Sequence, residues 1–241
     1  MADPPWYPKH MHGFMWSASK ITKIGGYVLF CLPPEGTRPD VGNEISEFIS
    51  YAKKIGFSLL RYTKGILSYS TPLFENNALR ADGIIDIGKD WRRGDLALFY
   101  RVKKTNFARP STFPDEEWTE VIIGDIRIRV RSSKSIEFRD PHLISVIPND
   151  ILPSVSRRDD RRKLADVWTS GNRIFACNGT NILIQILMAK SLNLSTTNSV
   201  STFLKRDLTT EEIALVFSTS RQIDELVKCE QEEIDYYHYS N

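Results

Sequence analysis

The chain has 241 residues, of which 41% are hydrophobic and 26% charged, an ordinary composition for a soluble globular protein. Its formal net charge of +2 provides no global electrostatic attraction to nucleic acid. No apolar run has transmembrane length, no signal-peptide pattern occurs and the three cysteines contain no C-x-x-C pair, so we expect a cytoplasmic protein without membrane partner or zinc knuckle. We expect no metal either, because His10 and His12 would point about 200° apart on a helix.

The N-terminal residues Asp3 to Tyr7 combine a carboxylate, two prolines and two aromatic rings. Each proline fixes φ near about −65° and removes an N–H, so the Asp3 and Pro4 carbonyls lie in a stiff segment where they can accept hydrogen bonds. A base stacked on Trp6 or Tyr7 would gain roughly 1–3 kcal/mol. These residue types suit a site that holds a flat, amine-bearing group. The alternative is a proline-rich turn that matches this description by chance.

Helical and strand patterns alternate after this segment. Two predicted helices are each ended by glycine, and their apolar faces consist of Met11, Phe14, Met15, Ala18 and Ile21 and of Ile45, Phe48, Ile49, Ala52 and Ile55. Residues 27–32 form a near-continuous apolar run, which predicts a strand covered on both faces and hence a parallel strand. Further strands are predicted over 57–62 and 96–102. This order is typical of an α/β sheet.

The motif Asp3-Pro4-Pro5-Trp6 resembles the DPPW motif of amino-group methyltransferases typified by the catalytic subunit of the mRNA adenosine-N6 methyltransferase. In that family the motif closes the fourth strand of a Rossmann-like sheet. Helix, strand, helix and strand then follow, and the last strand pairs antiparallel, which is similar to the order predicted here. The resemblance implies that Asp3 and the Pro4 carbonyl hold the target amine, that Pro5 and Trp6 complete the catalytic motif, and that Trp6 stacks on the base.

The resemblance also bears on completeness and on the cofactor. Only Met1 and Ala2 precede the motif, so we expect an N-terminally incomplete sheet, which a second protein chain could complete. The family uses S-adenosylmethionine, which a glycine-rich turn after a strand usually binds. The sequence has no G-x-G after a predicted strand, and Asn178 and Asn181, at the start of an apolar helix, are the candidate cofactor-binding residues.

Residues 63–95 are polar and are predicted to form a long loop, a kind of segment that is often functional. Trp91 in this loop is followed by Arg92 and Arg93. With Tyr7, these three residues are the candidate substrate-binding groups, since a tryptophan can stack on a base while arginines contact phosphate. The alternative is a tryptophan that anchors the loop beside solvated arginines.

Residues 118–131 predict a β-hairpin with a turn at Gly124-Asp125. One face of its second strand carries Arg127, Arg129 and Arg131. Such a row could bind a nucleic-acid backbone or an acidic partner. It could equally be a solvated face that hinders pairing of the sheet edge with other chains.

The charge-dense stretch 156–163 predicts a domain boundary. Beyond it we expect a strand over 173–177, helices over 182–192, 200–204, 211–216 and 223–229, and a frayed acidic tail. Several short helices with one short strand resemble a winged-helix-like interaction module. Three parts are therefore expected: a methyltransferase-like half-domain over 1–105, a hairpin region and linker over 106–155, and a helical module over 156–241.

The predicted fold class is α/β, with a partial Rossmann-like methyltransferase sheet, a β-hairpin region and a small, mainly helical C-terminal module. The predicted function is S-adenosylmethionine-dependent methylation of an exocyclic amine, with adenine N6 of a nucleic acid as the expected target. The alternative is a non-catalytic methyltransferase-like subunit that docks a partner through its C-terminal module.

Overall fold

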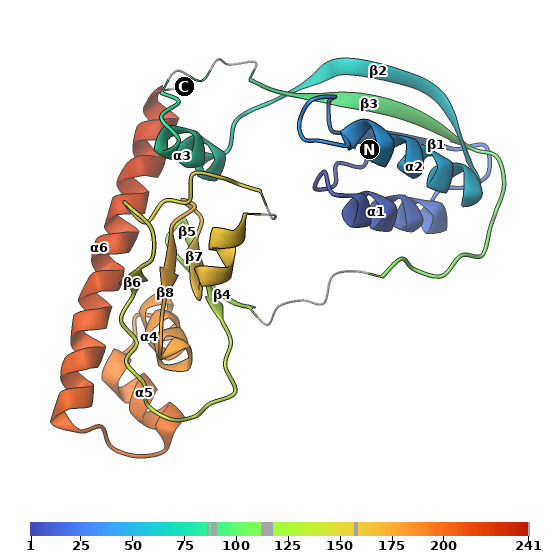
Figure 1. The fold of residues 1–241 in the computed structure, drawn as a ribbon. Helices are drawn as coiled ribbons and strands as arrows, with labels where there is room; N and C mark the ends of the chain where they lie inside the picture. The colour runs from blue at the N-terminus through green and yellow to red at the C-terminus, as the bar shows by residue number, and fades with distance from the viewer. Residues whose placement is uncertain (86, 88–90, 112–117, 157–158, 241) are drawn as a thin grey trace. The chain divides into compact units, whose positions relative to one another are not determined.

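The computed structural model describes residues 1–85, 87, 91–111, 118–156 and 159–240, without the side chains of 238–240. The chain is a mixed α/β protein with α-helices and two antiparallel sheets, shown in Figure 1. It divides into two compact units. Unit 1 consists of residues 1–71 and 88–114, and unit 2 consists of residues 72–87 and 115–241. Each unit has its own hydrophobic core.

Unit 1 contains a three-stranded sheet with the order β1–β3–β2. Its elements are α1 (Pro8–Ile21), β1 (Tyr27–Leu32), α2 (Val41–Lys54), β2 (Phe57–Tyr69) and β3 (Arg92–Arg101). Because β3 is antiparallel to both neighbours, β1 and β2 run in the same direction. Ala2 adds a parallel bridge to Phe30 on the outer side of β1. The segments at Ala2, β1 and β2 are therefore mutually parallel and are joined by α1 and α2.

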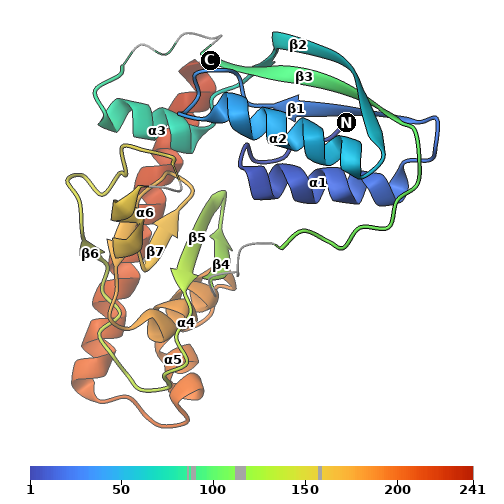
Figure 2. The same cartoon turned by 45° about the vertical axis from the view of Figure 1, so that its right-hand side comes forward.

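Helices α1 and α2 cover one face of this sheet, as Figures 1 and 2 show from two directions. Their predicted apolar faces supply the core: Met11 and Phe48 are fully buried and pack against Phe30 and Phe99 of the sheet. A buried aromatic side chain of this kind contributes about 1.5–3 kcal/mol. The prediction fails at Phe14 and at Ile21, which are exposed, because only part of the α1 stripe meets the sheet.

Two predictions for unit 1 hold only in part. The strand at 27–32 is covered on both faces only at its end, where Cys31 and Leu32 are fully buried, and its parallel pairing is limited to the bridge with Ala2, because the antiparallel strand β3 lies between β1 and β2. Tyr27 and Leu29 on its open face are 62% and 39% exposed. The predicted loop over 63–95 contains regular structure as well. A register irregularity between Thr63 and Leu67 lets β2 continue to Tyr69, and α3 (Leu73–Ala81) of unit 2 follows.

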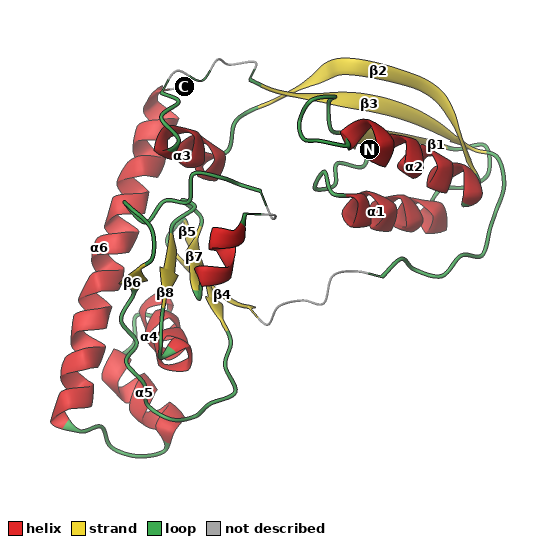
Figure 3. Cartoon of the chain, viewed as in Figure 1, coloured by secondary structure: helices red, strands yellow, loops and turns green. Residues whose placement is uncertain are grey.

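Unit 2 contains a five-stranded sheet with the order β4–β5–β7–β8–β6 and four α-helices among the residues that the structure describes. The strands are β4 (Trp118–Ile123), β5 (Ile126–Arg131), β6 (Ile144–Ser145), β7 (Val167–Thr169) and β8 (Ile174–Ala176), and Figure 3 distinguishes them from the helices. The remaining elements are α3, a 3-10 helix (Asp160–Leu164), α4 (Thr180–Ser191), α5 (Thr196–Leu204) and α6 (Thr210–Ser240). The predicted hairpin is thus confirmed, and so is a strand within 173–177.

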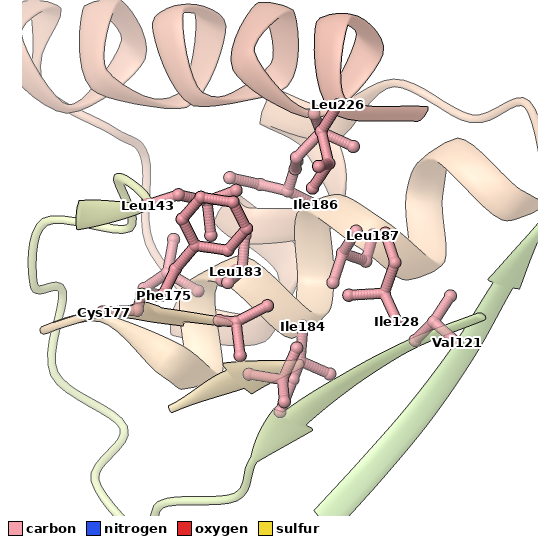
Figure 4. Close-up of a cluster of buried hydrophobic side chains, with 14 of the residues drawn as sticks. Val121, Ile128, Leu143, Phe175, Cys177, Leu183, Ile184, Ile186, Leu187 and Leu226 are labelled. Carbon is pink, nitrogen blue, oxygen red and sulfur yellow. The ribbon is translucent and has the colours of Figure 1, made fainter. Parts of the chain in front are cut away.

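Helix α4 lies at the centre of the core of unit 2. It is apolar on nearly every side, and a helix of that kind is stable only when surrounded. Figure 4 shows Leu183, Ile186 and Leu187 of α4 between the sheet, represented by Ile128, and Leu226 of α6. Burial of α4 therefore ties the sheet to the C-terminal helices.

The division into units differs from the three parts expected from sequence. The hairpin at 118–131 belongs to the same sheet as the strands beyond residue 156, because β5 pairs with β7. A single helix, α6, replaces the two helices predicted over 211–216 and 223–229 and extends through the tail that was expected to be frayed. Reciprocal capping begins this helix: the Glu212 N–H donates to Thr209 Oγ1 (3.2 Å) and the Thr209 N–H donates to Glu212 Oε2 (2.9 Å).

Candidate ligand site

The N-terminal motif lies at the carboxyl ends of the parallel strands of unit 1. Asp3 directly follows Ala2, which pairs with β1, and Tyr69 is the last residue of β2. Arg92, the first residue of β3, is the register partner of Tyr69. Ligands of α/β sheets bind outside the carboxyl ends of parallel strands, so a ligand site is expected at this edge.

The prolines give the motif its local shape. Pro4 is buried and Pro5 is exposed, and the Tyr7 N–H donates to the Pro5 carbonyl (2.7 Å) in a tight turn. Pro8 then begins α1, where its missing N–H costs no hydrogen bond. The turn leaves Trp6 half-buried beside the sheet instead of within the helix.

Four side chains converge here, and we call Asp3, Trp6, Tyr69 and Arg92 the Asp3 site. The Tyr69 hydroxyl donates to Asp3 Oδ1 at 3.2 Å. The rings of Trp6 and Tyr69 meet edge to face with centroids 5.7 Å apart. The Arg92 guanidinium lies 5.2 Å from the Trp6 centroid and 5.6 Å from that of Tyr69, within the range of cation–π attraction. A carboxylate, an aromatic pair and a fixed cation are therefore held together.

Burial controls the protonation of the hydroxyl and the thiol next to Asp3. It raises the pKa of Tyr69, and the hydrogen bond with Cys31 and the nearby Asp3 charge raise it further. Burial likewise raises the pKa of the Cys31 thiol. Both groups keep their protons at neutral pH. Tyr69 therefore serves as a hydrogen-bond donor to the Asp3 carboxylate and holds it in place.

Gly94 of β3 leaves room for the two rings. A Cβ at this position would lie 2.8 Å from Tyr69 Cε2 and 3.1 Å from Trp6 Cζ2. Gly94→Ala should therefore push the rings apart and change the near-ultraviolet circular dichroism of the protein, with only a modest loss of stability because side chains can shift. Gly42→Ala is the matched control, since a Cβ there meets nothing within 4 Å. An unchanged aromatic spectrum for Gly94→Ala would contradict this geometry.

The other substrate-binding candidates lie near this edge with different contacts. Tyr7 faces the Arg38 guanidinium, 5.5 Å from its ring centroid. Arg93 donates to the Gly65 carbonyl (3.3 Å), so it points away from its neighbour Arg92, and Trp91 is 52% exposed. Of the two arginines, the structure thus brings Arg92 to Trp6, whereas Arg93 contacts Gly65. Sequence reasoning missed Tyr69 and Gly94, because the predicted strand ended at Tyr62 and no local pattern signals a partner 66 or more residues away.

The cofactor candidates Asn178 and Asn181 belong to unit 2. Asn178 is exposed. The Asn181 side chain uses both ends of its amide on a neighbouring loop: Oδ1 accepts from the Ser133 N–H (3.2 Å) and Nδ2 donates to the Ser135 carbonyl. Asn181 is therefore a loop anchor at the start of α4, and its amide does not fit a cofactor-binding role.

Comparisons of the chain with family models, with curated proteins and with solved structures found no match. In the described part of the chain, no helix has the length and apolar character needed to cross a bilayer. The same residues contain no group of three or more His, Cys, Asp or Glu side chains that could hold a metal ion.

Proposed function

We propose that the chain is a methyltransferase-like protein whose Asp3 site holds an exocyclic amine on a flat base, with adenine N6 of a nucleic acid as the first candidate. The observation that carries this proposal is that the Asp3 carboxylate and the Trp6 ring both contact Tyr69 at the carboxyl ends of parallel strands. A carboxylate accepts hydrogen bonds from an amine, and an indole stacks on a base.

The topology of unit 1 supports a partial Rossmann-like sheet as part of this proposal. The resemblance implies a motif strand, helix, strand, helix and strand, followed by a last strand that is antiparallel. Unit 1 has this order: Ala2, α1, β1, α2, β2 and β3. Ala2 pairs in parallel with β1, β2 runs in the same direction as β1, and β3 is antiparallel to both strands. A chance proline-rich turn would not require this order.

Binding in this site would act mainly through orientation. Asp3 Oδ and the Pro4 carbonyl would accept the two amine hydrogens, while Trp6 and Arg92 limit rotation of the base. S-adenosylmethionine is the cofactor that the resemblance implies, and it supplies an electrophilic methyl group when bound. Since the Asn181 amide is engaged elsewhere, we assign no step through that cofactor.

Calorimetric titration with adenosine and with purine riboside, which lacks the amine, tests the proposal. Adenosine should bind more tightly, and Asp3→Asn should remove the difference, a loss of about tenfold or more because hydrogen bonds to charged groups contribute about 1.5–3 kcal/mol. Asp40→Asn is the matched control: it removes one exposed carboxylate in unit 1, and asparagine tolerates the positive φ of 65°. Equal affinities of the wild-type protein for both ligands would contradict the proposal.

The second candidate function is that of a non-catalytic methyltransferase-like subunit of the cytoplasm, which docks a partner through its C-terminal part or pairs with a second chain along the outer edge of β1. The engaged amide of Asn181 favours it. Titration with S-adenosylmethionine separates the two functions. Micromolar binding that is lost on Asp3→Ala favours the enzyme. Amine-dependent base binding without cofactor binding favours the non-catalytic subunit.

A further inference from the structure

The two units carry opposite charges, although the chain as a whole is nearly balanced. Unit 1 has 15 lysines and arginines and 7 aspartates and glutamates, a formal charge of +8. Unit 2 has 17 lysines and arginines and 23 aspartates and glutamates, a formal charge of −6. The net charge of +2 therefore hides a strongly basic unit, and charge asymmetry of this kind is typical of proteins that bind polyanions.

The excess of basic residues in unit 1 gathers where the parallel strands begin. Three segments meet there: the end of α1 with the following turn, the end of α2, and the residues after β3. Their contacts include the Gly25 N–H donating to the Arg101 carbonyl (2.9 Å) and the Val102 N–H donating to the Gly56 carbonyl (3.0 Å). Thr105 Oγ1 also donates to the Ile55 carbonyl (2.7 Å). Figures 1 and 2 show these ends together on the right-hand side of unit 1.

We call the exposed lysines on these segments the basic edge: Lys20, Lys23, Lys53, Lys54, Lys103 and Lys104. No aspartate or glutamate occurs in residues 4–34, 48–71 or 96–114, which contain all three segments. Lysines at helix C-termini stabilise the helix dipole, which accounts for Lys20, Lys53 and Lys54. That explanation does not extend to Lys103 and Lys104, which follow a strand.

Aromatic rings accompany the basic edge. Lys20 Nζ lies 4.9 Å and the Arg109 guanidinium 6.0 Å from the Trp16 ring, whose Nε1 donates to the Phe107 carbonyl (2.9 Å). The exposed ring of Tyr27 lies against that of Tyr100, with centroids 5.3 Å apart. Positive side chains that follow a backbone, with rings on which bases can stack, are the two components of single-strand recognition.

The open face of the sheet connects the basic edge to the Asp3 site. Side chains alternate along a strand, so Tyr27, Leu29 and Cys31 of β1 point to the same face. Tyr27 stands at the basic edge and Leu29 is 39% exposed. Cys31 is fully buried beneath the Asp3 site, where it is hydrogen-bonded to Tyr69. The path from Tyr27 to Cys31 is about 13 Å long at about 3.3 Å per residue, a span of a few nucleotides.

We propose that the basic edge binds the phosphodiester backbone of a single-stranded nucleic acid, which then runs along the open face of β1 toward the Asp3 site. The proposal deepens the proposed function, on which its nucleic-acid target rests, by naming the surface that binds the polynucleotide and the single-stranded form of that ligand. Its support comes from the lysines and does not depend on amine recognition by Asp3. The charge of +8 on unit 1 favours binding of a polyanion, although the net charge of the whole chain is only +2.

The test is fluorescence anisotropy with a labelled 20-residue oligothymidylate, titrated with the full chain from 50 to 300 mM KCl. Thymine has no exocyclic amine, so this probe reports backbone binding even if the proposed function fails. The test variant combines Lys53→Gln, Lys54→Gln, Lys103→Gln and Lys104→Gln. The matched control combines Arg127→Gln, Arg129→Gln, Lys134→Gln and Arg221→Gln, which removes four exposed positive charges from unit 2, two of them from the arginine row of β5.

We expect the test variant to bind at least about tenfold more weakly at 100 mM KCl and to have a salt dependence shallower by up to about 3, since each phosphate contact on a single strand contributes about 0.7 to the slope. The control should bind like the wild-type protein. Equal weakening by both variants would overturn the proposal, as would the absence of binding by the wild-type protein at 50 mM KCl. Binding to vesicles rich in phosphatidylserine without binding to the oligonucleotide would also overturn it. Circular dichroism melting curves establish that both variants are folded.

Discussion

Arg173→Ala is expected to destabilise unit 2 by about 3–5 kcal/mol, because removal of one partner leaves the other as an uncompensated buried charge. That partner is Glu230 of α6, whose side chain is 0% exposed. Arg173 Nη1 lies 3.5 Å from Glu230 Oε1, and its guanidinium also binds Glu233. Thr169 Oγ1 and the Gly171 N–H (3.1 Å) donate to the same Glu230 carboxylate.

The effect of Arg173→Ala should depend on pH. Burial raises the pKa of Glu230 above 4.5 even though Thr169 and Arg173 favour the charged form. A carboxyl whose pKa is higher in the folded state binds protons more tightly there, so acidification favours folding as the pH falls through the folded pKa toward 4.5. Without Arg173 the pKa of Glu230 should rise further. The difference in stability between variant and wild type should therefore shrink from pH 7.5 to pH 5.5.

Urea unfolding followed by circular dichroism at the two pH values measures this prediction. Lys163→Ala is the control, because Lys163 also pairs with a carboxylate, Asp160, but at the surface. The double variant Arg173→Met and Glu230→Leu should recover most of the loss, since it removes both buried charges. A loss below about 1 kcal/mol for Arg173→Ala, or a loss that grows on acidification, would show that Glu230 is not held as described.

Local patterns in the sequence were sufficient for elements whose stabilising contacts are close in the chain. The hairpin at 118–131 has a glycine turn and strict alternation in its second strand, and its strands pair from Trp118 with Arg131 to Ile123 with Ile126. The apolar faces of α1 and α2 were predictable for the same reason. The length of β2 was not predictable, because its second half is ordered by pairing with β3, twenty-three residues or more beyond Tyr69.

The candidate site shows the same limit. The chemistry of Asp3 and Trp6 can be read from one short motif, but the partners of these residues come from other strands. Tyr69 and Gly94 reach Trp6 only because β2 and β3 pair in a particular register. The net charge of the chain did not reveal the basic character of unit 1, because the opposite charges of the two units nearly cancel in the sum. The electrostatic attraction to nucleic acid is a property of unit 1 alone.

Gly56→Ala is the second substitution with a large expected effect, and it tests how the basic edge is built. Gly56 joins α2 to β2 with φ of 98°, and its carbonyl accepts hydrogen bonds from the Val102 N–H (3.0 Å) and the Lys103 N–H (3.4 Å). A Cβ at Gly56 would lie 2.2 Å from the Lys103 carbonyl oxygen. The obstacle is backbone, so no side-chain movement can relieve it.

We expect Gly56→Ala to destabilise unit 1 by about 3 kcal/mol or more, the sum of about 1–2 kcal/mol for a positive φ and the displacement of the chain at Lys103. Gly65→Ala is the matched control: its φ is 59°, but a Cβ there meets nothing within 4 Å, so it should lose only about 1–2 kcal/mol. The displacement would also separate Lys53 and Lys54 from Lys103 and Lys104. Oligothymidylate binding should therefore weaken in Gly56→Ala, at temperatures where it remains folded, and should be retained in Gly65→Ala. Equal stability losses in the two variants would show that close approach to Lys103 does not constrain this turn.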